Sequence, residues 1–520
     1  MEERIHLAAP SGLHDVRDVH DVGVEVPVAG AEHDGLETLP ARRASGAALL
    51  VLALRAAGAV AGVVVTGLLT RQLGPRGFGQ LSLILSVAML VSTVAELGTT
   101  YVTVAEMAAR PGRRGELSAG FVALRAVAGC VMAAAGGIVL VLLLHGPDES
   151  ADLAAVAVMA SVPLAAISGL TVLHQARLRP EIPAGLSLGQ SLLWLVAVIL
   201  AGTFEAPLSF YGLAFLVTGL VQAASSWLTV RGEVLWWSRS GSAARSILSR
   251  SWPLGVATVL GAVYYRLDAV LVFRLAGSTA AGFYLAAYRF LDVLQLAPIA
   301  LVSVLLPLLS RTWARGNREG FESILCLAIT VAAGIALPVA AGGIVAGGRV
   351  AVAVLGAEFR PAGDALAVLL LAFVSIATGY VYAAMLVAVG QVRVLAVVAA
   401  LAAFASVTAD LLVIPVWGAV GAAWVTVGVE YFVSSSLAVW IARHVGLRFP
   451  WGRIRAAVAA SVVLGVVAWA PRTAPLPVLL GVPAAAYLAA AGLLGAVTRA
   501  DLRRLAHPTL ALGAAAEGTG

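Results

Sequence analysis

Long apolar segments separated by short polar breaks make up most of this sequence. Fourteen of them are at least as long as the roughly 17 residues that a helix needs to cross a bilayer. They cover residues 46–69, 78–104, 117–144, 151–173, 184–203, 208–230, 251–273, 281–309, 321–346, 361–389, 394–415, 418–442, 454–471 and 475–497. Only 12% of the residues are charged, against about a quarter in soluble domains. The sequence therefore predicts an all-α, polytopic membrane protein with about 14 transmembrane helices.

The arginines of the loops are distributed unevenly between the two sides of the membrane. All 34 basic residues are arginines. The N-terminal segment and every second loop after it hold 24 of them, the intervening loops hold six, and four lie inside spans. Cytoplasmic loops carry the excess of basic residues in membrane proteins, so we expect both termini in the cytoplasm. This pattern also accounts for the net charge of +6, and no nucleic acid is expected as a partner.

A short internal repeat follows the first and the seventh spans, which read RQLGPRGFGQL and RLAGSTAAGFY. The residues that match at one constant offset are Arg71, Gly74 and Gly79 in the first copy and Arg274, Gly277 and Gly282 in the second. Because six spans separate the copies, both have the same orientation, as in transporters built from two parallel repeats. A chance likeness of two glycine-rich loops is the alternative.

The repeat divides the chain into two parallel six-helix lobes followed by a further helix pair. The expected parts are a disordered cytoplasmic tail (1–45), an N-terminal lobe (46–230), a cytoplasmic linker between the lobes (231–250), a C-terminal lobe (251–442), an additional transmembrane pair (443–497) and a cytoplasmic tail (498–520). The first tail carries nine acidic residues and little apolar periodicity, which is typical of disorder.

Nine ionisable residues are expected inside spans, where a charge near mid-bilayer costs roughly 2.5–3.5 kcal/mol even on a lenient scale. They are Arg55, Glu96, Arg125, Arg266, Asp268, Arg289, Asp292, Asp410 and Glu430. Each should therefore face protein or water. Arg289 and Asp292 are three residues apart on a helix and can pair. Arg266 and Asp268 are two apart and point to nearly opposite sides, so one of them should reach another helix or the outer interface.

Two roles are open for these residues. Arg289 could form a structural ion pair, or its guanidinium could bind the oxygens of a substrate diphosphate bidentately. Glu96, Asp268, Asp410 and Glu430 could couple transport to a proton or cation, or bond to a neighbouring helix. Four tyrosines could stack on sugar rings or anchor the membrane interface, namely Tyr264, Tyr265, Tyr284 and Tyr288. Interface anchoring is the role expected of Tyr284. The two isolated cysteines, Cys130 and Cys326, indicate neither a metal site nor a disulfide framework.

The stretch from residue 251 to residue 317 carries a recognisable set of short motifs. They are Arg266-Leu267-Asp268, Gly282-Phe283-Tyr284, Ala287-Tyr288-Arg289 and Leu305-Leu306-Pro307-Leu308-Leu309-Ser310-Arg311. In order and spacing they resemble the bacterial polysaccharide flippases, whose superfamily also holds the lipid II flippases and the multidrug extruders. The segments GAEFRPAGDAL, after Leu355, and GAVGAAW, in span 12, are similar to this family too. The resemblance covers roughly residues 46–445.

The resemblance implies a flippase that moves a polyprenyl-diphosphate-linked oligosaccharide across the bacterial cytoplasmic membrane by alternating access. In lipid II flippases an arginine at the position of Arg289 lines the central cavity, and Arg55 is a weaker match on the first span. With Asp292, Arg266 and Arg125 these are the candidate cavity residues. The expected partners are the lipid-linked oligosaccharide, membrane lipids and enzymes of polysaccharide biosynthesis. No cofactor, metal or catalytic residue is expected.

Three other functions remain open. An ion-coupled multidrug exporter of the same fold would need a cavity dominated by acids, whereas four arginines lie inside the spans. A polyprenyl-linked glycosyltransferase or polymerase would need catalytic groups presented in water, and no predicted outer loop carries a cluster of carboxylates and histidines. A scaffold that recruits partners through its N-terminal tail would lose its complex when residues 1–40 are deleted, whereas a transporter would keep transport.

Overall fold

A computed structural model describes residues 41–144, 149–232, 240–446, 449–469 and 474–494. Most of the two predicted tails therefore lies outside the described residues. Helix α1 begins at Ala41, within the last part of the predicted N-terminal tail. The described residues from Ala47 onward belong to one compact unit. They are almost entirely helical and contain no β-strand.

The helices follow one another with short connections. In chain order they are α1 (Ala41–Glu96), α2 (Thr99–Ala109), α3 (Arg114–Leu144), α4 (Glu149–Ser161), α5 (Ala165–Ser168), α6 (Val172–Ala176), α7 (Glu181–Thr203), α8 (Leu208–Val230), α9 (Ser240–Ala276), α10 (Ser278–Leu294), α11 (Leu296–Ala314), α12 (Arg318–Leu355), α13 (Ala362–Ala388), α14 (Val392–His444), α15 (Trp451–Trp469) and α16 (Leu476–Leu493). Four 3₁₀ turns, η1 (Pro111–Arg113), η2 (Val162–Leu164), η3 (Gly169–Thr171) and η4 (Ala357–Phe359), lie between them.

The helices account for the fourteen predicted spans. Ten are long and apolar enough to cross a membrane, and the two halves of α9, which meet at 47°, make an eleventh. Helices α1 and α14 each contain two spans, because Gly74 (φ 63°) and Gly418 (φ 55°) turn the chain sharply inside them. The shorter apolar helix Pro477–Leu493 completes the set. The predicted all-α, polytopic membrane fold is confirmed.

Besides span 7, which is bent inside α9, three other predicted spans are broken rather than continuous. Span 2 ends α1 at Glu96, passes through Leu97 and Gly98 with positive φ, and resumes as α2. Span 4 consists of α4, α5, α6 and the 3₁₀ turns η2 and η3. Span 8 is interrupted at Gln295, between α10 and α11, and Pro298 lies four residues after the end of α10. Proline lacks the N–H that would bond the carbonyl four residues earlier, so Pro298 and Pro163 explain two of the breaks.

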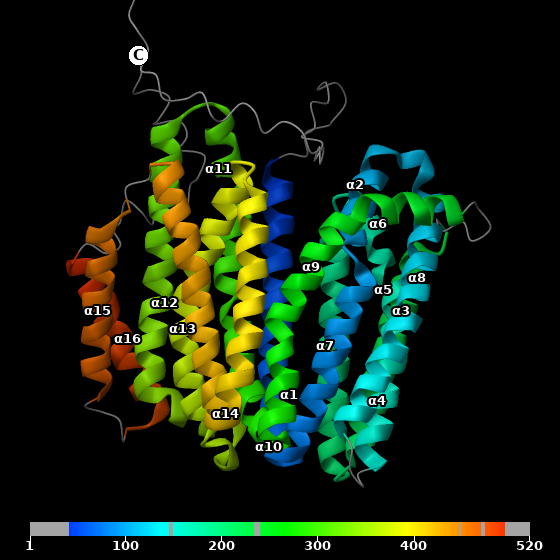
Figure 1. Cartoon of the computed structure of the whole chain (residues 1–520), viewed down its shortest axis with the longest axis horizontal. Coiled ribbons are helices and arrows are strands. Elements are labelled where there is room, and N and C mark those ends of the chain that lie inside the picture. The colour runs from blue at the N-terminus through cyan, green and yellow to red at the C-terminus, as the bar shows by residue number, and fades with distance from the viewer. Residues whose placement is uncertain (1–40, 145–148, 233–239, 447–448, 470–473, 495–520) are drawn as a thin grey trace, which may run out of the picture. The chain divides into compact units, whose positions relative to one another are not determined.

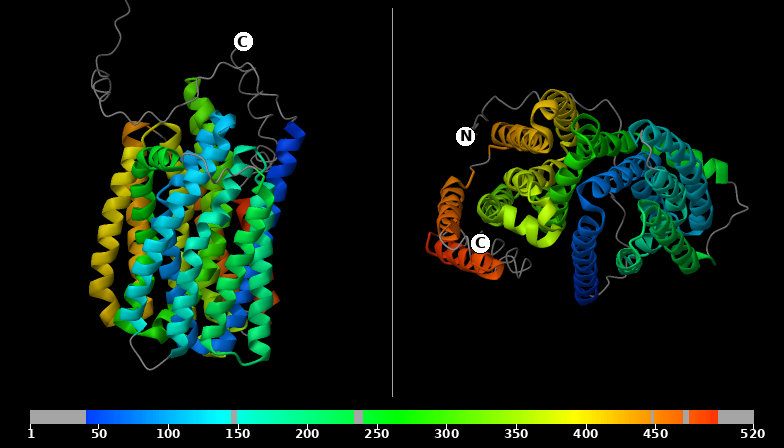
Figure 2. Two further views of the ribbon diagram at one scale, coloured as in Figure 1. Left: turned by 90° about the vertical axis from the view of Figure 1, so that its right-hand side faces the viewer. Right: turned by 90° about the horizontal axis from the view of Figure 1, so that it is seen from below.

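Two groups of helices and a terminal pair form the bundle (Figures 1 and 2). In the first group α8 packs against α4 and α7, with α3 alongside α4. In the second, α13 lies between α12 and α14 and also contacts α10 and α11. The pair α15–α16 packs on α12 at one edge. The α9 helix joins the groups, because its first part contacts α2 and α3 whereas α9 also packs on α14 and α10. Residues 240–250 of the predicted linker are thus helical.

The two copies of the repeat meet in a close contact, which we name the glycine seam and which consists of Pro75, Gly79, Ser278 and Gly282. A Cβ atom on Gly79 would lie 1.9 Å from the Ser278 carbonyl oxygen, and one on Gly282 would lie 2.1 Å from that of Pro75. The offset of 203 residues that relates Gly79 to Gly282 also relates Pro75 to Ser278. Each contact is therefore the counterpart of the other, as residues beside a two-fold axis are.

Candidate functional site

A cavity of about 1370 Å³ lies between the two groups of helices. Its walls come from α1, α3 and the segment α4–α8 on one side and from α10 and α11 on the other. Pockets for drug-sized ligands measure about 300–1,000 Å³. This cavity could therefore hold a larger ligand than those.

Three of the predicted arginines line this cavity, namely Arg55, Arg125 and Arg289. Within the described residues the Arg55 side chain has no hydrogen bond or ion pair. Arg125 is held in place, because it lies 3.8 Å from Glu96, donates to the Thr100 hydroxyl at 3.3 Å and sits 5.2 Å from the ring centroid of Phe121. Its side chain is 10% exposed, whereas that of Arg289 is 40% exposed. Arg289 is thus the more accessible of the two.

Asp292 lies between two arginines in this wall of the cavity. Its Oδ2 atom is 3.4 Å from Arg289 Nη1 and 3.5 Å from Arg266 Nη2. The predicted pair of Arg289 and Asp292 is therefore confirmed, and Asp292 itself lines the cavity. Arg266 is not among the lining residues; it is 14% exposed and lies 5.9 Å from the ring centroid of Tyr288. The structure thus places Arg266 behind Asp292.

Arg266 and Asp268 both contact α10, although their directions on α9 differ. Arg266 reaches Asp292, whereas Asp268 accepts hydrogen bonds from the Tyr284 hydroxyl and from the backbone N–H of Ala269. The two contacts on α10 are about two turns apart. Two side chains that point in different directions from α9 can therefore contact the same neighbouring helix, because they meet it at different heights along its axis.

Asp268 belongs to a buried polar cluster in the second group of helices, which we name the acidic cluster and define as Asp268, Asp410, Glu430 and their hydrogen-bond partners. Glu430 accepts from the Tyr264 hydroxyl at 2.7 Å, and Asp410 is 3.5 Å from the Ser406 hydroxyl. The three acids come from α9 and the two halves of α14. Within the described residues Asp410 Oδ1 has no hydrogen-bond partner.

A second, small cavity lies inside the acidic cluster. It measures about 10 Å³, which is close to the space that one water molecule needs. The residues around it are Tyr264, Tyr265, Asp268, Tyr288, Ser406, Thr426, Val429 and Glu430. Within the described residues no group of three or more histidine, cysteine or acidic side chains is placed to hold a metal ion.

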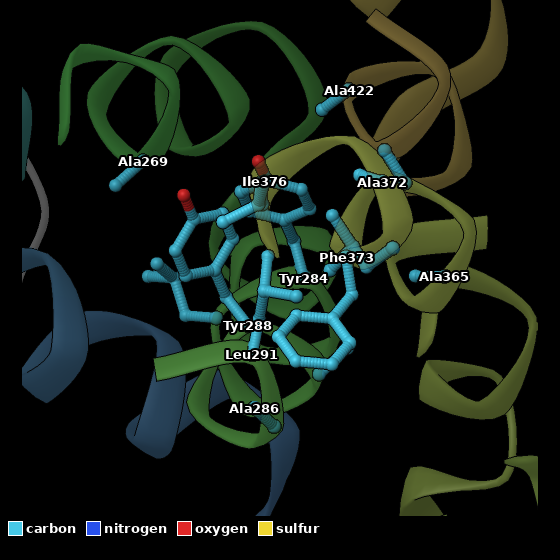
Figure 3. Close-up of a cluster of buried hydrophobic side chains, with 14 of the residues drawn as sticks. Ala269, Tyr284, Ala286, Tyr288, Leu291, Ala365, Ala372, Phe373, Ile376 and Ala422 are labelled. Carbon is cyan, nitrogen blue, oxygen red and sulfur yellow. The ribbon is translucent and has the colours of Figure 1, made fainter. Parts of the chain in front are cut away.

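Glu96 has the second of its two expected roles, a contact with a neighbouring helix, whereas Tyr284 differs from expectation. Glu96 lies apart from the other acids and pairs with Arg125, so it positions an arginine of the cavity. Tyr284 was expected to anchor the membrane interface, but it is fully buried against Tyr288. Figure 3 shows both rings in a core that they share with Phe373 and Ile376 of α13. The expectation for Tyr284 is therefore wrong, because its hydroxyl is satisfied inside the protein by Asp268 and Thr426.

Sequence reasoning missed several neutral polar residues of the large cavity. They include Gln175, Gln190, Gln222, Ser187 and Ser191, with the aromatic pair Trp194 and Phe215. The serines and Gln190 on α7 recur at helical spacing, which could have indicated one polar face. Gln222 lies on α8 between Thr218 and Ser226 at helical spacing, which could also have indicated a polar face. Gln175 lies on the short helix α6, and only the packing brings it to the cavity.

Several transporters of known structure have a fold similar to that of this chain. The lipid II flippase MurJ in an inward closed conformation is similar with a TM-score of 0.75 and 12% identity, over 88% of this chain and 100% of that one. An inward-facing multidrug resistance MATE family transporter of the MOP superfamily has a TM-score of 0.61 and 16% identity, over 77% and 98%. A MOP superfamily transporter from Pyrococcus furiosus has a TM-score of 0.54 and 16% identity, over 81% and 97%. These likenesses show the fold.

The sequence itself matches one family model. No curated protein matches it, but the model described as "polysaccharide biosynthesis protein" matches residues 46–313, which is more than half of the 520 residues. The match includes all of the first group of helices and the motifs around Arg289. Together with the membrane-spanning fold, it shows that the chain belongs to the polysaccharide biosynthesis protein family.

Proposed function

We propose that this protein is a flippase that moves a polyprenyl-diphosphate-linked oligosaccharide from the inner to the outer leaflet of a bacterial cytoplasmic membrane. A charged head group that carries sugars cannot cross hydrocarbon unaided, since the transfer of polar groups into an apolar medium is costly. A large cavity between two lobes can carry the head group by alternating access while the lipid tail stays in the bilayer. The product would serve envelope or exported polysaccharide synthesis.

The observation that carries this proposal is that three arginines line the same cavity, namely Arg55, Arg125 and Arg289. Guanidinium groups bind phosphate oxygens with two parallel hydrogen bonds. An exporter of cationic drugs needs acids instead, and the one acid among the described lining residues, Asp292, is already paired with two arginines. The arginine count therefore favours an anionic head group over a cationic drug.

The orientation of the bundle follows from the arginine bias of the loops. We place both termini, the linker between the lobes and the end of the bundle that contains α2 on the cytoplasmic side. The glycine seam then lies at the opposite, outer end of the bundle. The part of the chain from residue 46 to residue 230 then forms the N-terminal lobe, 251–442 the C-terminal lobe, and 443–497 the added pair. Enzymes that build the oligosaccharide are the natural partners of the cytoplasmic face.

Transport assays test the proposed function directly. In a strain without this protein, a lipid-linked oligosaccharide should accumulate in the inner leaflet, and restoring the gene should move it outward. The leaflet can be assigned with a glycan-modifying enzyme that is added to spheroplasts and cannot enter them. An unchanged distribution between the leaflets in the deletion strain would contradict the proposal.

The acidic cluster is the proposed coupling site. It holds Asp268, Asp410 and Glu430 of the C-terminal lobe, and none of these three carboxylates is in an ion pair within the described residues. A buried carboxylate that lacks a positive partner favours the uptake of a proton or cation. Asp410 Oδ1 has no hydrogen-bond partner within the described residues. Glu96 has a different role, because Arg125 already pairs with it.

Neutralising the acidic cluster should uncouple transport from an ion gradient. We expect Asp268→Asn and Asp410→Asn to abolish the acceleration of flipping by a proton or sodium gradient in proteoliposomes. A carboxylate can be neutralised by binding a proton or a sodium ion, whereas a neutral amide has no charge that such an ion could neutralise. Glu319→Gln, at the exposed start of α12, is the matched control and should keep the acceleration. A gradient response that survives in both cluster variants would contradict the coupling role.

A further inference from the structure

One wall of the cavity is polar but carries no charge. The lining residues from α7 and α8 include Gln190, Gln222, Ser187 and Ser191, and none of the residues that these two helices contribute is ionisable. On α7 the polar positions lie on the same face as Trp194, at helical spacing. The charged groups of the cavity come instead from α1, α3 and α10. The cavity therefore has an uncharged wall as well as cationic positions.

The two glutamines of this wall have unused hydrogen-bonding groups. Within the described residues neither Gln190 nor Gln222 has a side-chain hydrogen bond, and both are partly buried. Two glutamines elsewhere in the protein behave differently: Gln72 bonds Tyr211 and the Val198 carbonyl, and Gln295 bonds Tyr380. An amide has two donors and an acceptor with two lone pairs. Gln190 and Gln222 can offer these to a ligand.

An aromatic pair completes the uncharged wall. The rings of Trp194 and Phe215 meet edge to face, with centroids 5.6 Å apart, and both residues line the cavity. Aromatic rings present apolar surface at little conformational cost, and amides satisfy neighbouring hydroxyls. Sugars have both an apolar face and a rim of hydroxyl groups. The wall thus offers the two kinds of contact that a sugar ring needs.

The wall also lies next to a cationic position. A Cβ atom on Gly58 of α1 would be 3.8 Å from the Ser191 hydroxyl oxygen, so α7 and α1 are adjacent there. Arg55 is three residues before Gly58, on the same face of α1, and both line the cavity. A ligand with a diphosphate near Arg55 could therefore place its first sugars against Gln190 and Gln222.

We propose that the α7–α8 wall is the glycan subsite, in which Gln190 and Gln222 bind sugar hydroxyl or acetamido groups, and that it selects uncharged sugars over sugars with a free amine. This inference rests on the proposed function, and it specifies which class of sugar the transported oligosaccharide contains. A free ammonium group would meet no acid on this wall and would face the cavity arginines. An N-acetyl group presents a donor and an acceptor that match the glutamine amides.

Binding of three synthetic lipids to the purified full-length protein tests the proposal. The probes are a short polyprenyl diphosphate without sugar, the same lipid with a di-N-acetylated disaccharide, and the same lipid with the de-acetylated, free-amine disaccharide. We expect the acetylated probe to bind about tenfold more tightly than the bare diphosphate, which corresponds to one or two net hydrogen bonds. The free-amine probe should gain nothing over the bare diphosphate.

The double variant Gln190→Leu with Gln222→Leu should lose this tenfold advantage and keep its affinity for the bare diphosphate. Retained binding of the bare probe shows that the variant is folded. Gln391→Leu, at the exposed turn before α14, is the matched control and should behave as the wild type. The inference is overturned if wild type binds the bare and acetylated probes equally, or if the double variant keeps the preference. Failure of the wild type to bind any diphosphate probe would instead overturn the proposed function, and the inference with it.

Discussion

Replacing Gly282 by alanine should abolish transport and leave the outer end of the cavity open. The added Cβ atom would lie 2.1 Å from the Pro75 carbonyl oxygen. Because that neighbour is backbone, no change of rotamer can relieve the clash. Overpacking in a well-packed core costs typically about 1–3 kcal/mol, and separating the two lobes at the glycine seam is the available relief. Conformations in which the seam is closed should therefore become unfavourable.

Accessibility of a cysteine inside the cavity measures this change. In a background with Cys130→Ala and Cys326→Ala, a cysteine at Thr66, which lines the cavity, should react faster with an impermeant reagent from the outside when Gly282→Ala is present. Gly428→Ala is the matched control, because its Cβ atom would meet nothing within 4 Å, and it should match the wild type. Normal transport and normal labelling in Gly282→Ala would show that the seam does not close the cavity.

The reciprocity of the glycine seam predicts how its two glycines combine. Gly79→Ala should have an effect of the same direction and similar size, since its Cβ atom would lie 1.9 Å from the Ser278 carbonyl oxygen. One separation of the lobes relieves both clashes, so the double variant should be less disruptive than the sum of the single variants. Contacting residues are those for which such non-additivity is expected.

The sequence indicated the number of spans because each apolar run has a length fixed by the bilayer. The breaks within the spans were not predicted, because length and hydropathy do not report on backbone hydrogen bonds. A proline such as Pro298 leaves the carbonyl four residues earlier without its hydrogen-bond donor. The pair Arg289–Asp292 could be predicted because its geometry is local to one helix turn. The second arginine of Asp292 comes from another helix, α9, and a single sequence contains no signal for that approach.

The acidic cluster shows the same limit. Ser406 and Asp410 are one turn apart, and their contact could be read from spacing alone. The approach of Asp268 and Glu430 depends on how α9 packs against α14, which no periodicity specifies. The resemblance of the motifs to a family supplied the fold as a whole, and physical packing then decided which ionisable residues line the large cavity and which lie behind it.

Arg289→Ala should abolish flipping while the protein remains abundant and inserted in the membrane. Removing one partner of a buried ion pair usually costs about 3–5 kcal/mol because the other charge is left unpaired. Here Asp292 keeps Arg266 at 3.5 Å when Arg289 is removed, so that penalty is largely avoided. Losing a guanidinium that binds a diphosphate removes at least one hydrogen bond to a charged group, worth about 1.5–3 kcal/mol. Affinity for a polyprenyl diphosphate should therefore fall by roughly 10- to 100-fold.

Arg266→Ala is the matched control, because it removes the other arginine of the same carboxylate and leaves Asp292 paired with Arg289 at 3.4 Å. Arg266 does not line the cavity, so this variant should keep most of its diphosphate binding. Arg289→Lys should retain part of the affinity, since it keeps the charge and loses the planar fork. Abundance, diphosphate binding and flipping are measured for all three. Equal losses of binding in Arg266→Ala and Arg289→Ala would mean that the arginines serve only to hold Asp292, because a purely structural network does not distinguish the side chain that faces the cavity from the one behind it.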